Sequence, residues 1–287
     1  MALRLTLEDV SYSYPLPGRQ DAPALTGINV TVEPGEVLCI AGANGSGKST
    51  LAQICAGLLA PSSGSILYGK KMIKGRGDLL DFRRRVGLLF QSPEDQLFAD
   101  TAAKDIAFGP RNHGLKGEEL KAAVRNAAEL VDLPLQELGS RSPFSLSEGE
   151  KRRVALAGVL ALNPDVLILD EPFIGLDYDG RERLKSSLDR YNREREASIM
   201  IVTHELSDVW HIATRFALLS EGRLLRFDRK SDLLSGELEL SSLGMRLPQW
   251  GVLARELLRS GVSISDPADP GAIARAIATH REARGGR

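Results

Sequence analysis

A glycine-rich segment at residues 42–49 constrains this chain more than any other feature of its sequence. The pattern G-x-x-x-x-G-K-[ST] is matched by Gly42-Ala43-Asn44-Gly45-Ser46-Gly47-Lys48-Ser49, between an apolar run and a segment of helical character. Such glycines let backbone N–H groups point at phosphate oxygens, and the following helix N-terminus adds partial positive charge. The pattern predicts a triphosphate site at Gly42, Asn44, Gly45, Ser46, Gly47, Lys48, Ser49 and Thr50, with the Ser49 hydroxyl on Mg²⁺.

A second motif lies at the end of the apolar run 166–169, which is typical of a buried parallel strand. The run is followed by Asp170 and Glu171. Ligands in nucleotide-binding folds lie at the carboxyl ends of parallel strands, so Asp170 suits the Mg²⁺ shell and Glu171 suits polarising the attacking water. Alone, an Asp-Glu pair after a strand is more often a helix N-cap. Its occurrence with the phosphate loop favours catalysis.

The rest of the chain alternates strand and helix signals. We expect strands at 3–10, 27–32, 37–41, 86–90, 166–169 and 198–202, and hairpins at 61–68 and 216–227. Helical pieces dominate from 92 to about 158, and helical spacing returns at 247–260 and 271–283. A length of 287 residues suits one large α/β domain with a small appendage.

Composition excludes several classes of protein. Cys39 and Cys55 fall in apolar stretches without a metal-ligand spacing, so we expect them to be buried and reduced. The N-terminus lacks the apolar run of a signal peptide, and no stretch approaches the roughly 20 apolar residues of a membrane span. A role at a membrane therefore requires docking to another chain.

Residues 145–157, Ser-Leu-Ser-Glu-Gly-Glu-Lys-Arg-Arg-Val-Ala-Leu-Ala, resemble the signature of ATP-binding-cassette (ABC) ATPases, whose usual core is L-S-G-G-Q. Other motifs of that family occur in order: Gln91 after a strand, the D-loop ending in Asp177, and His204 after a strand. Tyr14 lies where the family keeps an aromatic that stacks on adenine, with Tyr12 as a competing candidate. The resemblance covers residues 3–227.

This resemblance implies a fold and an activity. The fold is α/β, with a P-loop (RecA-like) ATPase core, an antiparallel β subdomain and a helical signature subdomain at about 92–158. The ATPase domain spans 1–227, and a small C-terminal helical region at 228–287 is a candidate dimerisation element. The activity is hydrolysis of ATP with Mg²⁺, coupled to transport. Active sites of the family form between two head-to-tail subunits.

Each motif carries an expected role over to this chain. Lys48, Gln91, Glu171 and His204 are expected to be catalytic, and Ser49, Gln91 and Asp170 to hold Mg²⁺. Ser147 and Gly149 are expected to contact a γ-phosphate held by the partner subunit. Asp177 is expected to communicate between the two sites.

The signature departs from the family pattern at two positions. Glu150 replaces glutamine, a variant that the family tolerates, whereas Glu148 replaces glycine. A carboxylate near the γ-phosphate repels it unless the side chain turns away or the following basic helix offsets its charge. We therefore expect the site built with this signature to turn over more slowly than one built with a glycine.

Residues 91–98 and 105–110 narrow the resemblance to the ATPases of energy-coupling-factor (ECF) importers, including related cobalt and nickel systems. Those importers bring vitamins and transition-metal ions into prokaryotic cells. Phe98 and Phe108, beside Glu94, Asp95 and Asp105, suit a basic helix of a membrane partner or else pack the helical subdomain. Near the C-terminus, an intrachain or dimer contact is expected from the apolar stripe Trp250, Leu253, Leu257 and Leu258.

We therefore expect an ATP-hydrolysing subunit of an ECF-type importer, in a homodimer or in a heterodimer with a paralogous ATPase. A transmembrane coupling subunit, accompanied by a substrate-binding membrane subunit, holds it at the cytoplasmic face of the membrane. An alternative is a soluble ABC ATPase acting on nucleic acid or ribosomes. The net charge of −1 disfavours that alternative, and we expect no nucleic-acid partner. A regulatory cassette with little turnover is disfavoured by the presence of Glu171 and His204.

Overall fold

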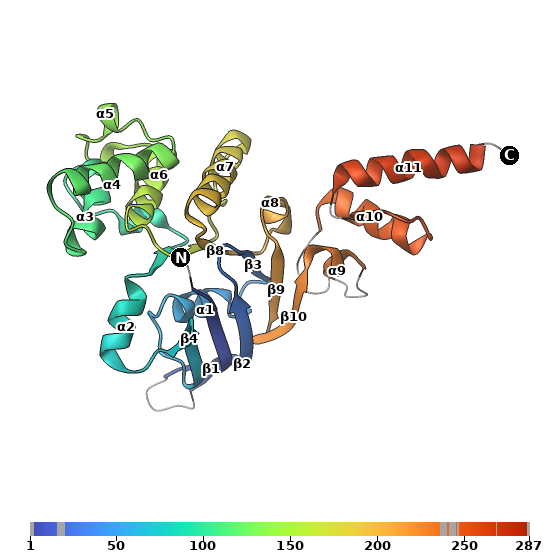
Figure 1. Cartoon of the computed structure of the whole chain (residues 1–287), viewed down its shortest axis with the longest axis horizontal. Coiled ribbons are helices and arrows are strands. Elements are labelled where there is room, and N and C mark those ends of the chain that lie inside the picture. Colours follow the sequence, from blue (N-terminus) through green and yellow to red (C-terminus); the bar gives the residue numbers. More distant parts are fainter. Residues whose placement is uncertain are drawn as a thin grey trace.

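The computed structural model describes residues 3–15, 21–235, 240, 245, 247–267 and 269–285. Two sheets form the middle of the molecule, a group of helices lies beyond one end of them, and the C-terminal helices lie at the other end (Figure 1). This arrangement agrees with the predicted α/β class.

The larger sheet has the strand order β10-β9-β3-β8-β7-β6. Its strands β3, β6, β7, β8 and β9 pair in parallel, and β10 closes the edge antiparallel to β9. Their bounds are Val37–Gly42 (β3), Val86–Leu89 (β6), Val166–Asp170 (β7), Ser198–Thr203 (β8), Arg215–Ser220 (β9) and Arg223–Arg229 (β10). The carboxyl ends of β3, β7 and β8 therefore meet at one edge of the sheet.

The central strands are buried on both faces, which explains their continuous apolar sequences. In β3, Val37, Cys39 and Ala41 face one hydrophobic core, while Leu38 and Ile40 face the other. Both cysteines are buried and free of disulfide bonds, as predicted. Burial raises the pKa of each thiol above its ordinary range.

The smaller sheet is antiparallel, with the order β2-β1-β4-β5. It consists of β1 (Leu5–Tyr14), β2 (Ala22–Val32), β4 (Ser63–Tyr68) and β5 (Lys71–Met72). Residues from this sheet, from helix α1 (Lys48–Cys55) and from one face of the larger sheet share a single core. Strand β1 is longer than the predicted run 3–10, and its last residue, Tyr14, reaches the phosphate loop.

The region predicted to be helical contains α3 (Ala102–Asn112), α4 (Gly117–Leu130), α5 (Leu135–Leu138) and α6 (Glu148–Leu160). Two 3-10 turns, Pro93–Gln96 and Pro143–Ser145, flank these helices. Helices α3, α4 and α6 pack together through small and branched apolar residues, among them Ile106, Val124 and Val154.

The remaining helices cover the ends of the sheets and form the C-terminal region. They are α2 (Gly75–Arg83), α7 (Tyr178–Arg195), α8 (Leu206–Val209), α9 (Lys230–Ser235), α10 (Gln249–Arg259) and α11 (Pro270–Gly285). Trp250 at the start of α10 packs edge-on against buried Trp210, with 5.6 Å between ring centroids. In the part of the chain that the structure describes, no helix has the length and apolarity required to cross a bilayer.

Candidate nucleotide-binding and catalytic site

The phosphate loop joins the buried strand β3 to helix α1. Gly45 and Gly47 adopt left-handed backbone conformations, with φ of 79° and 100°. A Cβ on Gly42 would come within 2.3 Å of the Leu219 carbonyl oxygen, so this position admits only glycine. The loop therefore curls tightly and opens helix α1 at Lys48, which directs backbone N–H groups toward a common point.

The ammonium of Lys48 is buried beneath this loop. Its Nζ donates hydrogen bonds to the carbonyl oxygens of Gly42 at 2.8 Å and Ala43 at 2.9 Å. Burial lowers the pKa of Lys48, while the nearby carboxylates of Glu171 and Asp170 act in the opposite direction. The cation is thus held at the base of the loop, close to both acidic residues.

Asp170, the last residue of β7, is buried beside the start of helix α1. The Ser49 hydroxyl donates a hydrogen bond to its carboxylate, and burial raises the pKa of Asp170. Among the described residues, its Oδ1 atom has no hydrogen-bond partner. A buried, unpartnered carboxylate oxygen beside a serine hydroxyl is a donor set that suits Mg²⁺.

Glu171 follows in a left-handed conformation, with φ of 48°, which is uncommon outside glycine. Its backbone N–H donates to the Val202 carbonyl of the neighbouring strand β8 at 2.8 Å. Its Oε1 lies 2.7 Å from Nδ1 of His204, which follows β8. The two predicted catalytic residues therefore meet because β7 and β8 are adjacent and end at the same level.

Tyr14 and Tyr12 were competing candidates for the aromatic contact, and the structure separates them. The hydroxyl of Tyr14 lies 3.0 Å from Oγ1 of Thr50 in helix α1. Tyr12 packs against the hydrophobic core and meets the Tyr14 ring edge-on, with 5.0 Å between centroids. Tyr14 is thus the tyrosine beside the phosphate loop.

These residues line one cleft of about 610 Å³. The predicted residues along its wall are Tyr14, Asn44, Gly45, Gly47, Lys48, Ser49, Thr50, Gln91 and Glu171. Asp170 and His204 adjoin this wall through Ser49 and Glu171.

Sequence reasoning missed four residues of the cleft: Pro23, Ala24, Glu221 and Gly222. Gly222 N–H donates to the Ser46 carbonyl at 3.1 Å, and the Gly222 carbonyl accepts from Thr26 N–H at 2.8 Å. The Glu221-Gly222 pair predicted only a hairpin turn. Its position against the phosphate loop follows from the pairing of β9 with β3, which a local motif does not show.

The signature residues lie outside this cleft. Ser147 caps helix α6, and both its N–H and its hydroxyl donate to Glu150 Oε2 at 2.8 Å. These bonds lower the pKa of Glu150. The exposed side chain of Glu148 forms an ion pair with Lys151 at 3.3 Å. The capping explains why glutamate is accepted at 150, because a capping box requires a glutamate or glutamine at that position.

Asp177 is also remote from the phosphate loop cleft. It caps helix α7 by accepting a hydrogen bond from Gly180 N–H at 2.7 Å. Together with Gly149 it lines a separate cavity of about 310 Å³. The chain thus gathers one group of predicted residues around the phosphate loop and leaves Ser147, Gly149 and Asp177 outside it.

Comparisons with known proteins agree with this geometry. Residues 25–174 match the family model described as ABC transporter. The chain is 40% identical over 263 residues to the energy-coupling factor transporter ATP-binding protein EcfA2 of Clostridium acetobutylicum, covering 91% of this chain and 92% of that protein. It is 42% identical over 245 residues to a putative ABC transporter ATP-binding protein of Gloeobacter violaceus, covering 85% and 96%.

Solved structures show the same fold. CbiO1 of Clostridium perfringens, part of an ABC transporter complex, is 35% identical, with a TM-score of 0.74 over 88% of this chain and 99% of that one. A dimeric ATP-binding cassette in a post-hydrolysis state, bound to ADP and Pi, is 26% identical, with a TM-score of 0.72 over 79% and 98%. The chain therefore belongs to the ABC transporter family, and it is an ATP-binding subunit whose ATP hydrolysis is coupled to transport.

Proposed function

We propose that this chain powers an ECF-type importer, with MgATP bound between the phosphate-loop cleft of one subunit and the signature segment of a second. The observation that carries the proposal is the separation of Ser147 and Gly149 from the cleft that Lys48 and Glu171 line. A signature that contacts nucleotide must then do so in another subunit. A dimeric relative bound to ADP and Pi supports this arrangement.

Within the cleft, each residue has a separate role in the in-line attack of water on the γ-phosphate. Lys48 exchanges its two carbonyl partners for phosphate oxygens, and Tyr14 stacks on the adenine. Ser49, Asp170 and Gln91 would hold Mg²⁺, which would supply positive charge to the phosphates. Glu171 orients or deprotonates the attacking water. His204 holds the Glu171 carboxylate and hydrogen-bonds the γ-phosphate.

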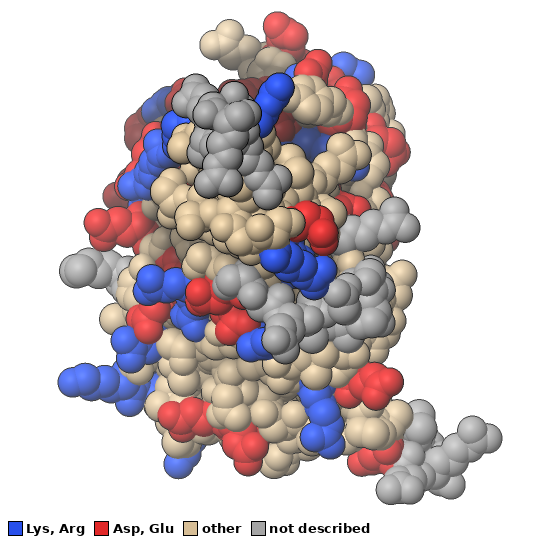
Figure 2. Space-filling view, turned by 90° about the vertical axis from the view of Figure 1, so that its right-hand side faces the viewer, with Lys and Arg blue, Asp and Glu red and all other residues tan. Residues whose placement is uncertain are grey.

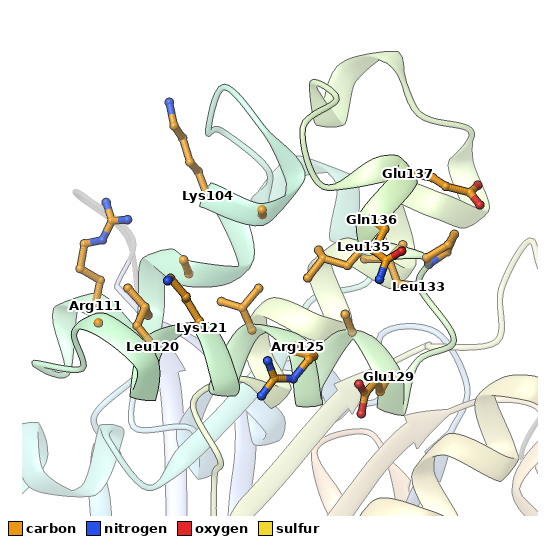
Figure 3. Close-up of a pocket in the computed structure, with 16 residues that line it drawn as sticks. Lys104, Arg111, Leu120, Lys121, Arg125, Glu129, Leu133, Leu135, Gln136 and Glu137 are labelled. Atoms are coloured by element: carbon orange, nitrogen blue, oxygen red, sulfur yellow. The ribbon is translucent and has the colours of Figure 1, made fainter.

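A groove in the helical subdomain suits the membrane partner (Figure 3). It has a volume of about 890 Å³. Apolar side chains from α4 and the 133–135 segment, such as Leu120, Val124 and Leu135, form its floor. Figure 3 shows long charged side chains around it, basic ones from Lys104, Arg111, Lys121 and Arg125 and acidic ones from Glu129 and Glu137. Such a groove accepts an amphipathic helix with an apolar face.

An exposed aromatic pair outside the groove lining, on α3 and the loop before it, suits the same partner. Phe98 and Phe108 are 58% and 46% exposed, and their rings meet edge-on at 4.6 Å. Exposed paired aromatics are typical of interface cores. Asp105 accepts hydrogen bonds from Phe98 N–H at 3.0 Å and Ala99 N–H at 2.8 Å, so it orders this loop. The exposed carboxylate available to a basic partner is therefore that of Asp95, because Glu94 is half-buried and interacts with Arg152.

The test is extraction of the tagged chain from its own cells in mild detergent. We expect it to co-purify with a transmembrane coupling subunit and a substrate-binding membrane subunit, at the cytoplasmic face of the membrane. The complex should hydrolyse ATP, and reconstituted vesicles should import a vitamin or a transition-metal ion. Recovery of the chain without membrane proteins, or with RNA or ribosomes, would contradict the proposal.

A further inference from the structure

The segment 172–176 connects Glu171 to Asp177 and helix α7. Pro172 and Phe173 are buried and Leu176 is half-buried, whereas Ile174 is 40% exposed and Gly175 is exposed in a left-handed conformation. One side of the segment borders the cavity of about 310 Å³ that Gly149 and Asp177 also line. Side-chain packing therefore fixes the start of the segment, and the exposed residues Ile174 and Gly175 depend more on backbone hydrogen bonds.

Two arginines from different helices donate hydrogen bonds to this backbone. From α6, Arg152 Nη1 donates to the Pro172 carbonyl at 3.0 Å and to the Ile174 carbonyl. From α7, Arg181 Nε donates to the Leu176 carbonyl at 3.2 Å. Alternate carbonyls of the segment are thus bound from both sides.

These hydrogen bonds hold the backbone directly after Glu171, whose conformation is strained. Glu171 keeps its left-handed conformation at a cost of order 1–3 kcal/mol, which persists only where the surroundings fix it. The Glu171 carbonyl accepts from Ile174 N–H at 3.3 Å, so Ile174 is bonded both to Glu171 and to Arg152. Loss of the guanidinium removes the two bonds from α6 to this turn, while the bonds of Ile174 N–H and Arg181 remain.

Arg152 also interacts with two acidic side chains. Its guanidinium is half-buried and interacts electrostatically with Glu94, in the loop after Gln91, and with Glu148 of the signature. These two carboxylates stabilise the charge of a guanidinium whose hydrogen bonds go to neutral carbonyls.

We propose that Arg152 is a positioning residue for ATP hydrolysis, which holds the 172–176 backbone so that Glu171 keeps its catalytic conformation. Arg152 does not line the phosphate-loop cleft, and its Nη1 is bonded to the Pro172 and Ile174 carbonyls, so its effect on the reaction passes through Glu171 of its own subunit. This inference rests on the catalytic role proposed for Glu171.

The test is steady-state ATPase kinetics of the full chain, purified with its membrane partner. A displacement of the base by about 1 Å costs up to roughly a hundredfold in rate, so R152Q should lower kcat by about ten- to a hundredfold. The KM for MgATP should change by less than about twofold, because the substitution removes no contact that binds the ground state and the transition state equally. R152K should be intermediate, since an ammonium keeps the charge and can donate to two carbonyls, as Lys48 does, but lysine lacks the planar guanidinium that is pre-organised for these bonds.

The control is R193Q, which removes an exposed arginine of α7 that, within the described part of the chain, pairs with Asp189 at 3.0 Å. It should leave kcat and KM unchanged. Because Arg152 acts through Glu171, the double variant E171Q/R152Q should be no slower than E171Q. Losses that add, a raised KM with normal kcat, or kinetics equal to R193Q would overturn the inference.

If R152Q does not fold, R152K decides: a lowered kcat at unchanged KM supports the proposal, and a wild-type kcat overturns it. A wild-type complex without hydrolysis would instead refute the proposed function. Hydrolysis in the wild type that R152Q leaves intact refutes only the role of Arg152.

Discussion

Nδ1 of His204 lies 2.7 Å from Oε1 of Glu171, joining the ends of two adjacent parallel strands at the edge of the phosphate-loop cleft. The contact holds the carboxylate of a residue whose backbone is strained. Substitutions at these two positions should therefore change the rate of ATP hydrolysis more than the affinity for nucleotide.

E171Q should lower kcat by about a hundredfold or more, because an amide is a poor general base. Affinity for ATP should stay within a few-fold, since Lys48 and the loop N–H groups are unchanged. ATPase assays and equilibrium nucleotide binding measure both quantities. E182Q, which alters an exposed glutamate of α7 paired with Lys185, is the matched control. A variant that hydrolyses ATP at the wild-type rate would exclude Glu171 as the base.

E148G should raise the turnover of the assembled complex. A carboxylate about 4 Å from phosphate charge is repelled by roughly 1 kcal/mol even in water, which corresponds to about fivefold in rate. The same change removes the Glu148–Lys151 ion pair at the start of α6 and introduces glycine there, so the melting temperature should fall slightly. An unchanged rate in the ATPase assay would show that the Glu148 side chain turns away from the nucleotide.

D170N should lose the stabilisation that Mg²⁺ adds to ATP, measured as the shift in melting temperature with ATP alone and with MgATP. Burial raises the pKa of Asp170 in the folded state, so the folded chain binds this proton more tightly than the unfolded chain does. The free energy of unfolding therefore falls as pH rises through the interval between the ordinary and the raised pKa.

D170N removes that dependence on pH. Without Mg²⁺ and nucleotide, the variant should be at least as stable as the wild type at pH 7. A lower melting temperature under those conditions would contradict the sign of this argument. An Mg²⁺ shift as large as that of the wild type would remove Asp170 from the metal site.

The double variant F98A/F108A should weaken association with the membrane partner while ATP affinity stays unchanged, because exposed aromatics contribute to an interface rather than to the core. Co-purification yield and equilibrium ATP binding are the two measurements. L80A is the control, since Leu80 is 50% exposed and belongs to α2, outside the helical subdomain that carries the phenylalanines. Equal yields from all three proteins would place the docking surface elsewhere.

The C-terminal stripe divides into two kinds of residue. Trp250 packs against Trp210, whereas Leu253 is 45% exposed on the same helix. Viewed from that end of the molecule, positive and negative side chains are interspersed among uncharged ones (Figure 2). W250A should therefore lower the melting temperature. L253D should reduce the fraction of dimer, measured by molecular mass in solution, without lowering the melting temperature. A dimer that is unaffected by L253D would assign α10 to packing within the chain.

Much of the fold and site was predictable because the motifs are local. Residues 42–50 and 166–171 each combine a buried strand with the functional residues directly after it, so one segment of sequence contains both. The choice between Tyr12 and Tyr14 was not local: both lie on one strand, and only the contact with Thr50 separates them. The hydrogen bonds from Arg152 to the 172–176 backbone could not be predicted for the same reason. Every residue has a carbonyl oxygen, and no sequence motif marks the one that is bound.

The two carbonyl bonds of Lys48 bear on ligand choice. An anion that approaches this ammonium must compete with partners already in place, so it gains only the difference between its own attraction and theirs. A phosphate oxygen, being charged, outcompetes a neutral carbonyl, whereas an uncharged ligand gains almost nothing from the exchange. The bonds that Lys48 already makes therefore select for anions at the loop.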